Sequence, residues 1–167
     1  MRAVKASAGH GRNGKREAAL TDRSNDVSAM LDEMAIRRLL DEYCLRLEIN
    51  QFEDWLDLFT HDTVYDVFRQ SLRGREEVAA MLSQAPHGIH LPGATRIELG
   101  TDTAQTVQSY LFLSASEDTW NAGWYQRTVV RTGEGWKIAH TRVKIGRLGN
   151  LAPEEKARML AFPVQFA

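Results

Sequence analysis

Apolar residues recur along the chain with two different spacings. In residues 29–49 they lie three or four positions apart, which is the spacing of one face of an amphipathic helix. The stripe consists of Ile36, Leu39, Leu40, Tyr43 and Leu47. After residue 93, runs rich in strand-favouring residues replace this pattern, and Thr95 to Leu99 alternates strictly. The chain therefore predicts helices first and strands afterwards.

The predicted elements follow in a definite order along the chain. The first part carries three helices and one strand, at 29–49, 51–60, 75–83 and 62–68 respectively. The second part carries four strands separated by turn residues, at 93–100, 103–114, 122–132 and 135–146. Proline and two glutamates open a last predicted helix at 153–161. Short connections between strands favour antiparallel hairpins.

This order predicts an α+β fold. We expect a cone-shaped α+β barrel, in which helices pack on the concave face of a curved mixed or antiparallel sheet. Such a sheet leaves a funnel under the helices, and ligand sites prefer concave places of this kind. The length of 167 residues favours one domain with a sizeable core.

Charge and composition narrow the class of protein. The net charge of −1 gives no reason to expect nucleic acid as a partner. Residues 1–25 carry a charge of +4 and lack an apolar run, so we expect a flexible basic arm there. The predicted domain then covers 26–150, with a C-terminal helix or tail over 151–167. No window resembles a secretory signal or a membrane span, and the single Cys44 fits a reducing, cytoplasmic setting.

Two histidines near the first long strand are the clearest titratable candidates. His90 stands just before Pro92 and Gly93, where it is either an ordinary loop histidine or a base aimed into the funnel. His87 and His90 have a spacing that suggests metal, but no third ligand stands at a convincing distance in sequence. We therefore predict no metal site.

The ordered set of segments resembles the SnoaL-like branch of the nuclear-transport-factor-like cone fold. The likeness spans roughly residues 33–147 and rests on Tyr43, the WLDLF segment, His90, GWY and the GWKI segment. Members include dehydratases, a dehydrochlorinase, ketosteroid isomerases, polyketide cyclases and the small subunits of ring-hydroxylating dioxygenases. The resemblance implies an internal pocket, no cofactor, and a homo-oligomer such as a dimer or trimer.

The same resemblance implies a catalytic pair. By position, the acid of the eliminating members is Glu48 and the histidine is His90, with Tyr43 five residues before the acid. The family residue is usually Asp, so Glu48 departs from the pattern by one methylene. A carboxylate hydrogen-bonded to imidazole would fix its tautomer and stabilise the imidazolium. The alternatives are an ion-pair ladder of Glu48 with Arg37 and Asp41, and simple core packing of Tyr43.

We expect the pocket wall to hold aromatic and basic side chains, namely Tyr65, Phe112, Trp124, Tyr125, Arg142 and Lys144. Tyr65 can point into the funnel or out of it, and the tryptophans can equally be core or interface residues. In some eliminating relatives, a basic residue on the last strand holds a developing anion. Here Arg142, Lys144 and Arg147 are the candidates, and a solvated strand face is the alternative.

Two functions from different classes follow. The first is a cofactor-independent lyase, dehydratase or isomerase, which uses the acid and histidine to take a proton from a hydrophobic ring-containing small molecule. Aromatic compounds, steroids, terpenoids and polyketides are all within the range of the family. The second is a non-catalytic subunit or ligand-binding module, because FEDWLDLFTHDTVYDVF resembles the start of dioxygenase small subunits.

Overall fold

The protein is described by a computed structural model that covers residues 10–48, 52–115, 117–150 and 154. The chain divides into two compact units, Met1–Met34 and Ala35–Ala167. Helix α1, His10–Glu48, supplies the described part of the first unit and continues into the second. The prediction of a helix beginning at residue 29 was therefore wrong, because residues 10–25 are helical where we expected a flexible arm. The segment KREAAL at 15–20 consists of strong helix formers and needs no apolar periodicity to form a helix.

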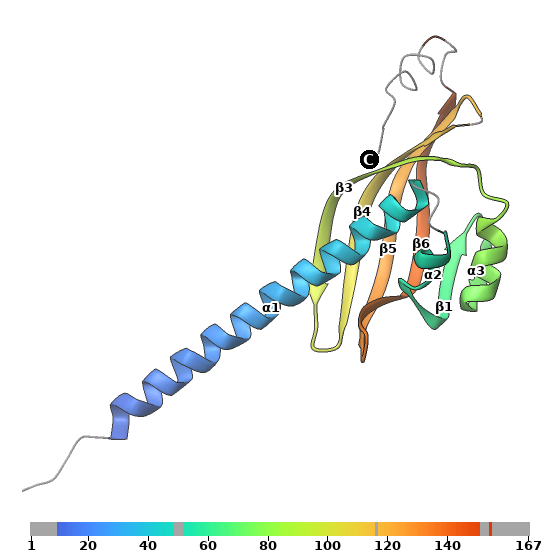
Figure 1. Cartoon of the computed structure of the whole chain (residues 1–167). Coiled ribbons are helices and arrows are strands. Elements are labelled where there is room, and N and C mark those ends of the chain that lie inside the picture. Colours follow the sequence, from blue (N-terminus) through green and yellow to red (C-terminus); the bar gives the residue numbers. More distant parts are fainter. Residues whose placement is uncertain (1–9, 49–51, 116, 151–153, 155–167) are drawn as a thin grey trace, which may run out of the picture. The chain divides into compact units, whose positions relative to one another are not determined.

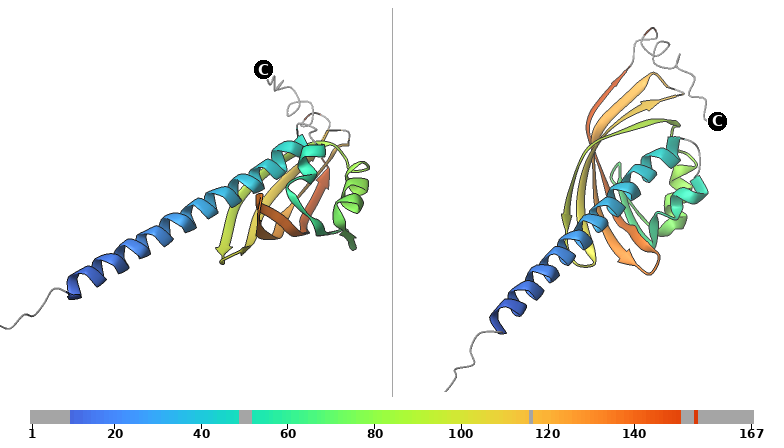
Figure 2. Two further views of the ribbon diagram at one scale, coloured as in Figure 1. Left: turned by 60° about the horizontal axis from the view of Figure 1, so that its bottom comes forward. Right: turned by 60° about the vertical axis from the view of Figure 1, so that its left-hand side comes forward.

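The second unit is built on one six-stranded sheet with the order β2-β1-β6-β5-β4-β3 (Figure 1). The strands are β1 (Phe59–Val67), β2 (Gln70–Arg73), β3 (Gly88–Leu99), β4 (Thr103–Ser114), β5 (Thr119–Thr132) and β6 (Gly135–Asn150). Neighbouring strands are antiparallel except β1 and β6, which are parallel. The strands bend strongly along their length (Figure 2). The predicted α+β class with a curved mixed sheet is confirmed.

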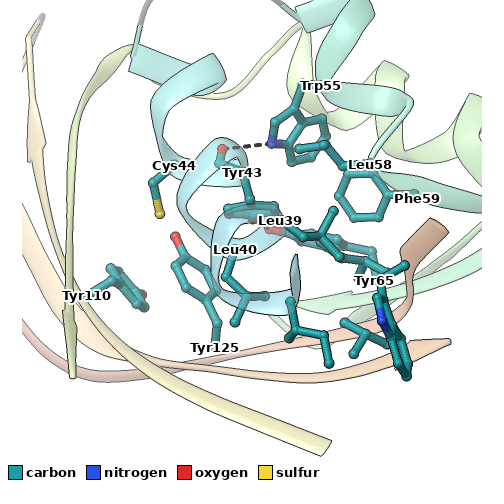
Figure 3. Close-up of a cluster of buried hydrophobic side chains, with 14 of the residues drawn as sticks. Leu39, Leu40, Tyr43, Cys44, Trp55, Leu58, Phe59, Tyr65, Tyr110 and Tyr125 are labelled. Carbon is teal, nitrogen blue, oxygen red and sulfur yellow. Dashed lines mark hydrogen bonds between the residues drawn. The ribbon is translucent and has the colours of Figure 1, made fainter. Parts of the chain in front are cut away.

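Helices cover the sheet and form the core with it. The short helices are α2 (Phe52–Leu56) and α3 (Gly74–Leu82), and α3 packs against β1 and β2. The apolar stripe of α1 is buried at Ile36, Leu39, Leu40 and Tyr43, and it meets the aromatic side chains of α2 and the strands (Figure 3). The indole Nε1 of Trp55 donates a 3.0 Å hydrogen bond to the backbone oxygen of Tyr43, which fixes α2 on α1. None of the described helices is both long and apolar enough to cross a membrane.

The first long strand begins earlier than the sequence predicted. β3 starts at Gly88 rather than at residue 93, and its register against β4 shifts between Pro92 and Thr95. A proline is tolerated here because β3 is an edge strand and the irregularity absorbs the missing N–H. His90 therefore lies inside the strand, paired with Phe112 of β4, and not at its entrance. The predicted helix at 153–161 falls outside the described residues except for Glu154.

Candidate functional site

A cavity of about 160 Å³ opens between the C-terminal end of α1, α3 and the inner face of the sheet. Its wall is mostly apolar and aromatic, and its polar atoms come from a few side chains. These are Tyr43, Tyr65, His87, His90, Tyr110, Asn121 and Tyr125. An apolar cavity with a small number of converging polar groups is the usual form of a small-molecule site.

Two tyrosine hydroxyls meet in this cavity. The hydroxyl of Tyr43 on α1 and that of Tyr65 on β1 are 2.6 Å apart, and both side chains are buried. Burial raises the pKa of both phenols well above the usual value; the charge of Tyr125 raises the pKa of Tyr43 further, and the charge of Tyr43 raises that of Tyr65. The pair is therefore neutral at physiological pH and can donate a hydrogen bond or a proton to a ligand oxygen.

His90 presents its imidazole to the same cavity. Its ring stacks at a tilt against Phe112, with centroids 4.6 Å apart, and its buried Nδ1 has no hydrogen-bond partner among the described residues. Burial lowers the pKa of His90 to about 4, and the positive charge of Arg127 adds to this shift. The imidazole is thus neutral near pH 7.

Glu48 is joined to His90 through the main chain. Its Oε1 accepts a 3.0 Å hydrogen bond from the backbone N–H of His90, whereas the sequence predicted a bond to the imidazole. Burial raises the pKa of Glu48, and this hydrogen bond partly opposes the rise. Strand β3 begins at Gly88, two residues before His90, so the carboxylate of α1 meets the backbone of β3 and not the imidazole ring.

The sheet register decides which predicted wall residues belong to the cavity. Tyr125 and Phe112 line it, as does Tyr65. Trp124 and Lys144 pair with each other between β5 and β6 and alternate with the cavity residues Tyr125 and Val143. Their side chains therefore lie on the opposite face of the sheet, where Trp124 is 49% exposed.

Arg142 shares that outer face. It forms a 3.4 Å ion pair with Asp66, which also makes a 2.7 Å hydrogen bond with Nε2 of His140. The prediction of Trp124, Arg142 and Lys144 as pocket residues was thus wrong. The sequence did not establish the register of these strands, and a slip of one residue exchanges the two faces.

A buried arginine that sequence reasoning missed lies behind the cavity wall. Arg127 on β5 is 2% exposed, and its guanidinium carbon is 4.2 Å from the ring centroids of both Tyr43 and Tyr125. Its Nη1 donates a 3.1 Å hydrogen bond to Oε1 of Gln108. A signal was present in the sequence, because Arg127 occupies the same strand face as Tyr125 and Val129. A charged residue on an apolar face is unusual enough to mark a site.

Other candidate groups do not extend the site. Cys44 is buried beside the tyrosines, and burial raises the pKa of its thiol to about 11, which keeps it protonated. Over the residues that the structure describes, no three His, Cys, Asp or Glu side chains are grouped as metal ligands would be. The functional groups in and behind the cavity wall are therefore a neutral imidazole, phenols, an amide and the buried guanidinium of Arg127.

Comparison with known proteins places the fold. A family model for the SnoaL-like domain matches residues 28–142. Among solved structures, a proposed scytalone dehydratase from Novosphingobium aromaticivorans superposes with a TM-score of 0.69 at 19% identity, covering 76% of this chain and 92% of that one. Hexachlorocyclohexane dehydrochlorinase LinA-type3 from Novosphingobium barchaimii gives a TM-score of 0.70 at 17% identity, with 77% and 95% covered.

A proposed aromatic ring hydroxylase from N. aromaticivorans gives a TM-score of 0.65 at 19% identity, covering 76% of this chain and 97% of that one. At these identities the structural likeness shows a shared fold alone. None of the curated protein sequences matches the chain. The family model, however, covers more than half of the 167 residues. The chain therefore belongs to the SnoaL-like domain family.

Proposed function

We propose that the protein is a cofactor-independent lyase or isomerase that takes a proton from a carbon next to a carbonyl or similar group of a hydrophobic ring compound. The observation that carries this proposal is the meeting, in one apolar cavity, of the neutral imidazole of His90 and the hydroxyl pair of Tyr43 and Tyr65. One group accepts a proton and the other supports the oxygen on which negative charge develops.

The proposed steps balance with the residues present. The imidazole of His90 takes the proton, and the electron pair of the broken C–H bond moves into an enolate. One tyrosine hydroxyl donates to the other, which donates its own hydrogen to the enolate oxygen. In an elimination, the enolate then expels a leaving group, which takes the proton from the imidazolium; in an isomerisation, the imidazolium returns the proton to another carbon. Glu48 acts as a positioning residue through the backbone of His90.

The surroundings favour the tyrosines as the stronger contributors. A histidine whose pKa is about 4 is a weak base, so proton transfer depends on strong stabilisation of the enolate. Hydrogen bonds in a water-poor cavity supply such stabilisation, because the local dielectric constant is low. The imidazolium and the enolate also form together and attract each other.

The cavity limits the size of the buried part of the ligand. A volume of about 160 Å³ is close to that of an engineered cavity, roughly 150 Å³, that binds benzene. One ring therefore fits within the enclosed part. Larger ring compounds, such as steroids or polyketides, would extend through the opening beside α3.

A direct test is deuterium exchange into a ring ketone. β-Tetralone incubated with the protein in D₂O should gain deuterium next to its carbonyl, followed by NMR. His90→Ala should lower the enzyme-dependent rate roughly 10²- to 10⁴-fold. His61→Ala, which removes an exposed histidine of β1, is the matched control and should leave the rate unchanged. Equal rates in the two variants would refute the role of His90.

A second candidate is a ligand-binding subunit without chemistry of its own. Two observations favour it: Glu48 binds the backbone rather than the ring of His90, and the imidazole is a weak base. The likeness in fold to a proposed aromatic ring hydroxylase is consistent with such a subunit. Saturable binding of β-tetralone without any enzyme-dependent exchange would support this candidate against the first.

A further inference from the structure

Arg127 is buried without a counter-charge. Its Nε and Nη2 have no hydrogen-bond partner among the described residues, and none of the ion pairs found there involves it. Guanidinium is not deprotonated in proteins, so the site keeps a full positive charge. Among the described residues, the guanidinium of Arg127 contacts two tyrosine ring faces and the side-chain amide of Gln108. Across β6, the buried hydroxyl of Thr141, its register partner, also lacks a hydrogen bond.

The positive charge of Arg127 lies behind the tyrosines whose hydroxyls meet in the cavity. The ring of Tyr43 separates the guanidinium from the cavity, and the same ring carries the hydroxyl that meets Tyr65. Figure 3 shows Tyr43, Tyr65 and Tyr125 converging on one region of the core. The wall itself offers no compensation, because none of its described residues is Asp, Glu, Lys or Arg.

The groups that face this charge are neutral or poorly able to oppose it. They are Tyr43 and Cys44 of α1, Tyr65 of β1, His90 of β3 and Tyr125 of β5. Burial raises the pKa of the three phenols and of the thiol, so all four stay protonated at neutral pH. The charges of Glu48 and Asp41 also reach Cys44, but neither carboxylate lies in the cavity wall, and Glu48 is bound to the backbone of His90.

We propose that Arg127 is a positioning residue whose positive charge makes this cavity prefer ring compounds that carry a negatively charged oxygen, or develop one during reaction, over rings that stay neutral. Phenols and enolisable ketones are the preferred classes. This inference rests on the proposed function and names its substrate class. The positive potential reaches the ligand through the Tyr43–Tyr65 hydroxyl pair, in which one hydroxyl donates to the other and the second donates to an anionic oxygen. It disfavours cationic ligands and reactions through carbocations by the same argument.

Binding of para-nitrophenol tests the inference without any turnover, because its absorbance reports its ionisation. Relative to Arg127→Met, the natural protein should lower the pKa of the bound phenol by about one unit, the smaller end of the effect of a neighbouring arginine on an acid. It should also bind para-nitrophenolate roughly tenfold more tightly than para-nitroanisole, a neutral ring of similar shape.

Three variants separate charge from structure. Arg127→Met should abolish both the shift and the preference. Arg131→Met is the matched control, because Arg131 lies four residues along the same strand and pairs with Asp102 at the surface. It should behave as the natural protein does. Arg127→Lys keeps a charge without the planar fork; it should retain part of the shift and remains informative if Arg127→Met does not fold.

The outcomes distinguish this inference from the function on which it rests. An equal pKa of bound para-nitrophenol in the natural protein and in Arg127→Met overturns the role of Arg127. If para-nitroanisole binds in that case, the ring-binding site and the proposed function still stand. If neither ring compound binds the natural protein, both the inference and the proposed function fail.

Discussion

The hydroxyl pair of Tyr43 and Tyr65 yields a sharp prediction about stability. The two oxygens are 2.6 Å apart, and the side chains are 1% and 5% exposed. Changing one tyrosine to phenylalanine removes one hydroxyl and leaves the other buried without that partner. The remaining hydroxyl then carries the cost of its desolvation, about 1–3 kcal/mol. Changing both tyrosines removes both polar groups and avoids most of this cost.

The expected result is a strongly non-additive double-mutant cycle. Tyr43→Phe and Tyr65→Phe should each lower the free energy of unfolding by about 1–2 kcal/mol. The double variant should lose no more than either single variant, which gives a coupling energy of about 1–2 kcal/mol. The phenylalanine rings preserve the aromatic packing around Trp55 and Phe59, so cavity formation does not contribute.

Urea unfolding of the four proteins measures this directly. The midpoints should change while the slopes stay equal, which shows that the unfolded states are comparable. Additive losses, with the double variant close to the sum of the two single variants, would refute the reasoning. That result would mean that each hydroxyl is satisfied independently, for example by water in the cavity, and that the pair does not act as a unit.

Two further predictions concern ionisation and the outer face of the sheet. All four tyrosines of the chain have a raised pKa, so none should ionise at about pH 10, where exposed tyrosine does. The tyrosine hydroxyls of the unfolded chain lose their protons at lower pH than those of the folded protein. Their contribution to the free energy of unfolding is therefore constant below about pH 10 and falls as the pH rises further. Tyrosinate absorbance that appears well before unfolding would contradict this. Trp124→Ala and Lys144→Ala should leave β-tetralone exchange within about twofold, because surface changes away from a site have small effects; a loss comparable to that of His90→Ala would place them in the site after all.

The sequence predicted the fold class because helix and strand periodicities are local properties. The stripe from Ile36 to Tyr43 is visible without knowledge of the partners, and the strand at 103–114 matches β4 residue for residue. The prediction of a flexible arm did not anticipate the helix there, because it relied on apolar periodicity. Residues 10–25 lack an apolar stripe, yet they are helical, because helix propensity there does not need a buried face.

The site was harder to predict because it depends on register between distant segments. The family resemblance made Tyr43 and His90 candidates, but the atom of His90 that meets Glu48 follows from where β3 begins. The faces of β5 and β6 follow from the irregularities in their pairing near Gly123 and Val129. These register shifts decide whether a side chain faces the cavity or the outer surface, and the local sequence pattern does not predict them.

The unpaired polar atoms argue that this cavity is more than a gap in the core. Buried polar atoms in folded proteins nearly always have partners, so each exception calls for a reason. Here Nδ1 of His90, two nitrogens of Arg127 and Oγ1 of Thr141 all lack one among the described residues. A core selected for stability alone would place apolar side chains at these positions, since replacing a buried charge with an apolar group is often neutral or stabilising. A neutral imidazole, a phenol pair and an uncompensated cation, brought together in one place, instead suit a ligand whose oxygen becomes negative as its proton leaves.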